Sequence, residues 1–149
     1  MNYAKRFQVR KSPTILLLHW RVKSRFWICS ATKIEFLLIH NMGQACRYCT
    51  LWADGFNGFL PHLESVMSIF LVSRDAPNLQ RAFAGSRNWG YRLASHGAGD
   101  YASEQTVMEG EANMPGAVVY QRDGDSITRK NSAIFGPGDL YCSAWNWQA

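Results

Sequence analysis

The sequence contains no apolar run of the roughly 18 residues that a membrane-spanning helix needs. The longest early run, residues 15–18, is too short for the core of a signal peptide. The chain also has no Gly-rich phosphate loop of the P-loop or dinucleotide type, so we expect no organic cofactor. These absences predict a soluble, cytoplasmic protein, and its 149 residues are enough for one domain with a buried core.

Acidic residues are absent from the first 33 residues, which hold eight Lys and Arg. The other eight Lys and Arg share residues 34–149 with all eleven acidic residues, so that part has a net charge of −3. We therefore divide the chain into a basic N-terminal arm, residues 1–33, and one domain, residues 34–149. A basic arm can bind nucleic acid or a membrane surface. We favour a solvated extension and do not expect nucleic acid as a partner.

Cysteine is scarce, with four residues in the chain, and only Cys46 and Cys49 are close in sequence. A secreted disulfide scaffold would be shorter and richer in cysteine, so a reducing compartment is favoured, where a close pair is more often catalytic or metal-binding. The spacing C-x2-C-x12-H to His62 lacks the second histidine of a zinc finger at positions 66 to 68. We expect no metal at the pair, although an irregular zinc site that includes His40 stays open as the weaker alternative.

The predicted domain alternates between short apolar runs, which are typical of buried strands, and stretches with the apolar spacing of a helix. Short runs rich in strand formers predict three buried strands, at residues 34–40, 68–73 and 91–95. Between the first two strands, apolar residues recur every three to four positions, which predicts a helix with a break near Pro61.

The remaining elements follow the same reasoning. A helix is expected over residues 75–85, with Leu79 and Phe83 on its buried face. Asp123–Gly124 predicts a hairpin between two strands, and a last helix is expected over residues 140–147. This order predicts an α/β fold in which helices flank a central mixed β-sheet.

The cysteine pair lies where the first strand gives way to a helix. Unpaired N–H groups at a helix N-terminus favour a thiolate over a thiol, and Arg47 adds positive charge. These effects lower the pKa of a cysteine from its free value of ~8.5. We predict that Cys46 is the exposed attacking sulfur and that Cys49, within disulfide reach, resolves the mixed disulfide. Arg47, Tyr48 and Trp52 are predicted to contact the substrate.

Five segments are similar to the bacterial "domain of unknown function 899" family of the thioredoxin-like superfamily. They read IHNMGQACRYCTLWADGFNGFLPHLE, FLVSRDAP, NWGYRLASHGAGDY, NMPGAVVYQRDGD and GPGDLYCSAW. The resemblance implies a thioredoxin-like fold with C-x-x-C at a helix N-terminus, without a settled substrate. The family would continue its last helix, so we expect that helix to be truncated in this chain.

The resemblance also suggests roles for residues outside the pair. In thioredoxin-like folds a proline before a hairpin strand is cis and lies against the cysteines, and Pro115 has that place. Met114 would then present its backbone to an extended substrate. His40 stands where thioredoxins carry a buried acid, which implies proton transfer, and a hydrogen-bonded core histidine is the alternative. Peroxiredoxins place Thr or Ser where Gly43 stands, which argues against a peroxidase of that kind.

Together these features predict a thiol–disulfide oxidoreductase whose partners are protein or small-molecule thiols and disulfides. Fold alone does not establish activity, because many proteins share a fold without sharing a reaction. A thioredoxin-fold binding module whose cysteines do not turn over is therefore the main alternative.

Overall fold

The computed structural model describes residues 34–96, 107–108, 110–111, 113–123 and 126–147. The predicted basic arm, residues 1–33, and the tip of the predicted hairpin, residues 124–125, lie outside the described residues. Among the helices in the described part of the chain, none is long and apolar enough to cross a membrane.

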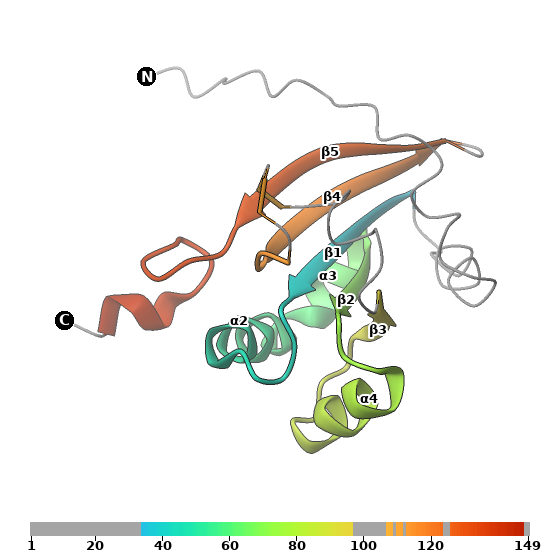
Figure 1. Cartoon of the computed structure of the whole chain (residues 1–149). Helices are drawn as coiled ribbons and strands as arrows, with labels where there is room; N and C mark the ends of the chain where they lie inside the picture. The colour runs from blue at the N-terminus through green and yellow to red at the C-terminus, as the bar shows by residue number, and fades with distance from the viewer. Residues whose placement is uncertain (1–33, 97–106, 109, 112, 124–125, 148–149) are drawn as a thin grey trace.

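A five-stranded mixed sheet organises the described chain, with the strands in the order β3-β2-β1-β4-β5 (Figure 1). The first three strands along the chain run parallel, whereas β4 pairs antiparallel with β1 and with β5. This arrangement confirms the predicted mixed sheet. The strands are β1 (Glu35–Asn41), β2 (Ser68–Ser73), β3 (Arg92–Ser95), β4 (Gly116–Asp123) and β5 (Ser126–Ile134).

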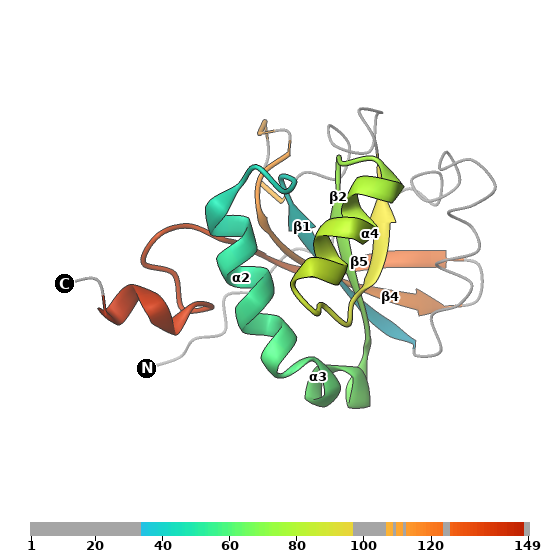
Figure 2. The same cartoon turned by 90° about the horizontal axis from the view of Figure 1, so that it is seen from below.

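Three α-helices cover one face of the sheet, and Figure 2 shows α2 and α4 in front of it. They are α2 (Arg47–Gly58), α3 (Leu60–Val66) and α4 (Pro77–Ser86). The predicted break is confirmed, because Phe59 separates α2 from α3 and Pro61 lies in the first turn of α3. Proline fits there because the first N–H groups of a helix have no partner within the helix.

Two predictions about the later helices are wrong. The last helix is only a short 3-10 helix, η2 (Ser143–Trp147), which begins three residues later than predicted. The Asp139 carboxylate accepts the N–H groups of Tyr141 and Cys142 in the turn before it. In α4, Leu79 is 48% exposed and Gln80 is buried instead. The Gln80 side chain donates to Ser73 Oγ and to the Ala94 carbonyl, both at 3.0 Å, and this attaches the helix to the sheet.

The sheet carries a separate apolar cluster on each face. Side chains alternate along a strand, so β1 contributes Ile39 to the helix-covered face and Phe36 and Leu38 to the other. The cluster under the helices comprises Ile39, Trp52, Ala53, Leu60, Ile69, Leu71, Tyr91 and Phe135. The far-face cluster comprises Phe36, Leu38, Phe70, Val72, Ala94, Val107, Val118 and Tyr120.

Candidate redox site

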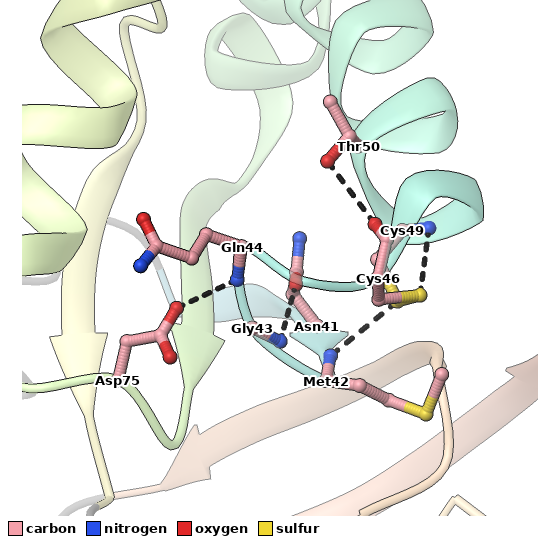
Figure 3. Close-up of a disulfide and its surroundings, with 8 residues drawn as sticks. All are labelled: Asn41, Met42, Gly43, Gln44, Cys46, Cys49, Thr50 and Asp75. Carbon is pink, nitrogen blue, oxygen red and sulfur yellow. Dashed lines mark hydrogen bonds between the residues drawn. A yellow bond between two sulfur atoms is a disulfide. The ribbon is translucent and has the colours of Figure 1, made fainter.

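Cys46 and Cys49 form a disulfide at the start of α2 (Figure 3). Cys46 is the N-cap residue, with an extended backbone, and the two Cα atoms are 5.3 Å apart. The Cys46 carbonyl accepts the N–H of Thr50 at 3.1 Å, which begins the helical hydrogen bonds. The strand-to-helix junction therefore places both sulfurs on the first turn, as the spacing of the two residues predicts.

The two sulfurs differ in exposure and in hydrogen bonding. Cys46 is half-buried, whereas Cys49 is 3% exposed. Cys46 Sγ accepts the N–H of Cys49 at 3.1 Å, and Cys49 Sγ accepts the N–H of Met42 at 3.4 Å. Hydrogen bonds to an ionised acceptor are stronger than those to a neutral one, so both amides favour negative charge on sulfur when the disulfide is reduced.

The loop before Cys46 is fixed by two side chains that the sequence reasoning missed. Asn41 Oδ1 accepts the N–H of Gly43 at 2.8 Å, and Asp75 Oδ2 accepts the N–H of Gln44 at 2.7 Å. The Gly43 carbonyl in turn accepts the N–H of Cys46 at 3.0 Å. The sequence did hold one indication of these two residues. Asn41 ends β1 and Asp75 closely follows the parallel neighbour β2, so both lie at the same edge of the sheet.

Gly43 is required by this loop. Its φ of +112° lies in the region that favours glycine, and a Cβ atom there would lie 2.8 Å from Asp75 Oδ1. The position therefore has no space for a Thr or Ser side chain unless Asp75 moves.

The predicted substrate-contacting residues on α2 lie in different environments. Arg47 is exposed, and Tyr48 is 51% exposed. The Tyr48 ring packs against Trp145 of η2, with centroids 5.5 Å apart, and against Trp52 at 6.3 Å. Trp52 is only 3% exposed because Phe135 and Trp145 cover it, so it supports Tyr48 from beneath and has almost no surface for a substrate.

The peptide bond between Met114 and Pro115 is trans, so the expected cis bond is wrong. A trans bond is the usual form of an X–Pro pair. Asn113, just before the pair, has a left-handed backbone with a φ of +59°. Gly116 of β4 pairs with His40 of β1, and the two strands are antiparallel. Pro115, which precedes Gly116, therefore lies level with the end of β1, beside the loop that leads to Cys46. Met114 packs against the far-face cluster.

His40 does not share a face of the sheet with α2. It continues the row of Phe36 and Leu38 along β1, so its side chain points to the far face. Burial lowers the pKa of His40 to about 3, with smaller contributions from His96 and Arg129. The imidazole is therefore neutral at pH 7.

The irregular zinc site is not formed. Within the described residues, no group of three or more His, Cys, Asp or Glu side chains could hold a metal ion. His62 is exposed on α3, beyond the far end of the helix that begins with the cysteines.

Comparison with known proteins identifies the fold and a family. Residues 34–147 match the model of a family described as "Bacterial protein of unknown function (DUF899)". Among proteins with curated descriptions, none matches the sequence.

Several solved structures have a similar fold. Peroxidoxin BcpB from Mycobacterium tuberculosis is 20% identical, with a TM-score of 0.54 over 86% of this chain and 80% of that one. A putative thioredoxin reductase from Burkholderia cenocepacia is 16% identical, with a TM-score of 0.57 over 76% and 71%. A cysteine-to-serine mutant of peroxiredoxin Q from Xanthomonas campestris is 16% identical, with a TM-score of 0.57 over 67% of each chain. These similarities establish a thioredoxin-like fold, as the sequence predicts.

Proposed function

We propose, from the premise that this chain belongs to the bacterial DUF899 family and has a thioredoxin-like fold, that it is a thiol–disulfide oxidoreductase. The observation that supports this most directly is the asymmetric pair at the start of α2. One sulfur is half-exposed, and its partner is buried and accepts a backbone N–H. Such asymmetry suits an attacking thiol followed by a resolving thiol.

The reaction begins with the reduced protein. The Cys46 thiolate attacks one sulfur of a partner disulfide, so an S–S bond forms to Cys46 and the other partner sulfur leaves as a thiolate. Cys49 then loses its proton and attacks Cys46 Sγ, which closes the intramolecular disulfide and releases the second partner thiol. Two electrons pass to the partner, and a dithiol reductant must return them for the next cycle.

Residues around the pair are proposed to serve this exchange. Arg47 and Tyr48 lie exposed on the first turn, where a partner that reaches Cys46 would contact them. Pro115 and Met114 approach the same end of the sheet and remain proposed contacts for the partner chain. His40, which lies on the face of the sheet opposite α2, is not proposed to exchange protons with Cys49. The partners are thiols and disulfides of proteins or small molecules, and the proposed location is the cytoplasm.

Peroxide reduction of the peroxiredoxin kind is not proposed, although two of the compared structures are named as peroxiredoxin-type proteins. The position three residues before Cys46 is Gly43, where Asp75 occupies the space a Thr or Ser would need. The loop therefore requires glycine at position 43.

Trapping of the mixed disulfide tests the proposal. In a background with Cys29 and Cys142 replaced by Ser, the reduced protein is mixed with a chromogenic aromatic disulfide. The unmodified pair should release two thiols per chain and end as a disulfide. The Cys49→Ser variant should release one thiol and retain an adduct on Cys46, identified by mass spectrometry. Equal reactivity of the Cys46→Ser variant, or an inert pair, would favour the non-catalytic binding module.

A further inference from the structure

Asp75 is anchored to the rigid part of the sheet. Its N–H donates to Ser73 Oγ at 3.3 Å, and its carbonyl accepts the hydroxyl of Ser95 at 2.6 Å. Ser73 ends β2 and Ser95 ends β3, so two strands fix the backbone of this residue. From that position its carboxylate reaches across to the N–H of Gln44, as Figure 3 shows.

The segment that Asp75 contacts also carries the hydrogen-bond donor for the buried sulfur. Gly43 packs directly against the carboxylate, and Met42, the preceding residue, donates its N–H to Cys49 Sγ. Asn41 holds the same segment from the β1 side through the N–H of Gly43. Two side chains, one from the end of β1 and one from the loop after β2, therefore fix the loop that presents this amide to the sulfur.

We propose that Asp75 is a positioning residue of the redox site, which holds the loop of residues 42–44 so that the Met42 N–H stays directed at Cys49 Sγ. This inference rests on the proposed thiol–disulfide function. Asp75 itself touches neither the substrate nor the reacting sulfur in this role. It acts through the backbone of the loop.

The direction in which a substitution of Asp75 shifts the redox equilibrium distinguishes a positioning role from an effect of its negative charge. An N–H donor stabilises a thiolate more than a disulfide sulfur, so at a pH that ionises Cys49 in the reduced protein, loss of the aligned Met42 N–H disfavours the reduced state. The equilibrium constant for reduction by a reference dithiol should then fall. Removal of a nearby negative charge has the opposite effect, because it favours thiolates and raises that constant.

Two variants of Asp75 separate these effects. The intact protein, in the background without Cys29 and Cys142, is equilibrated at an alkaline pH that ionises Cys49 with reduced and oxidised dithiothreitol, which exchange two electrons with the pair. Asp75→Ala removes the acceptor, and the constant should fall about tenfold, equivalent to ~30 mV. Asp75→Asn keeps an oxygen acceptor without the charge and should stay within about twofold of the wild type. An equal rise in both variants, or an unchanged Asp75→Ala, would overturn the inference.

Controls connect the result to the loop. Glu35→Ala removes an exposed carboxylate at the opposite end of β1 and should leave the constant unchanged. Gly43→Ala pushes the loop against Asp75 from the other side and should lower the constant too, so it decides the matter if Asp75→Ala does not fold. An unchanged constant in folded Gly43→Ala protein would then overturn the inference.

A wild-type pair that never equilibrates with the dithiol refutes the proposed function, whereas a working pair with an unaffected Asp75→Ala refutes only the positioning role.

Discussion

Asp54 in α2 and Arg87 after α4 form an ion pair through two side-chain hydrogen bonds, although 33 residues separate them in sequence. Trp89 Nε1 donates to the same carboxylate at 2.8 Å. The helix that begins with the cysteines is thus linked to the segment that enters β3. Both charged side chains are about one-third exposed, so solvent screens the pair and its contribution to stability is modest.

The first prediction concerns this pair. Hydrogen bonds from Arg87 hold the pKa of Asp54 below its usual 3.8, so the carboxylate stabilises the fold above that pH and loses this contribution as the pH falls through its folded-state pKa. Asp54→Asn should cost less than about 1 kcal/mol of unfolding free energy at pH 7. Urea unfolding at pH 7 and pH 3 should show the difference shrinking in acid. A difference that grows at pH 3 would contradict the assignment.

The second prediction concerns His40. Its folded-state pKa of about 3 lies below the ordinary 6.5, so between these values the unfolded chain binds a proton that the native protein excludes. Stability from this group is complete above pH 6.5 and falls as the pH drops toward 3. We expect wild type to lose on the order of a few kcal/mol relative to His40→Gln across this window, measured by urea unfolding.

His62→Gln is the matched control for His40, because His62 is exposed on α3, and its profile should follow that of the wild type. Near pH 6.5, the rate of disulfide exchange should depend on pH in the same way in wild type and in His40→Gln. An NMR titration of the His40 ring with a midpoint near 6.5 would contradict the predicted neutrality.

The third prediction concerns the order of alkylation in the reduced protein. Cys46 is half-exposed at the helix start and Cys49 is buried, so iodoacetamide should modify Cys46 at least about tenfold faster. The pH dependence of this rate should have its midpoint below ~8.5, because the amide of Cys49 favours the thiolate. Peptide mass spectrometry after short pulses measures both quantities. Faster labelling of Cys49, or a midpoint at the free value, would remove Cys46 from the attacking role.

The fourth prediction compares two glycines. A Cβ at Gly116 would lie 2.4 Å from the Ala133 carbonyl oxygen and 2.5 Å from Val107 Cγ1, so Gly116→Ala should destabilise the protein by about 1–3 kcal/mol or more. Gly55 in α2 has no atom within 4 Å of the same position, so Gly55→Ala should stabilise by up to about 1 kcal/mol. Thermal melting of both variants measures the contrast. Similar shifts in the two would show that strand pairing at Gly116 adapts to a side chain.

Much of the fold could be predicted from residues close together in sequence. Strand and helix periods gave the positions of β1, β2 and β3, and Pro61 marked the break before α3. Prediction failed at residues 140–142, where the chain forms a turn on the Asp139 carboxylate and only the 3-10 helix Ser143–Trp147 follows. It failed at Trp52 too, because its burial depends on Phe135 and Trp145, which come from the other end of the chain.

The sequence by itself determined that two cysteines share the first turn of a helix after a buried strand, because spacing and periodicity are local properties. The position of Cys46 at the helix start also predicted it as the more exposed sulfur. Only the tertiary structure decided which amide meets the buried sulfur and which carboxylate holds the loop of that amide. Asp75 and Gln44 lie 31 residues apart, and they meet because parallel pairing brings the ends of β1 and β2 to one edge of the sheet. No local pattern encodes that meeting, since it depends on how the whole sheet assembles.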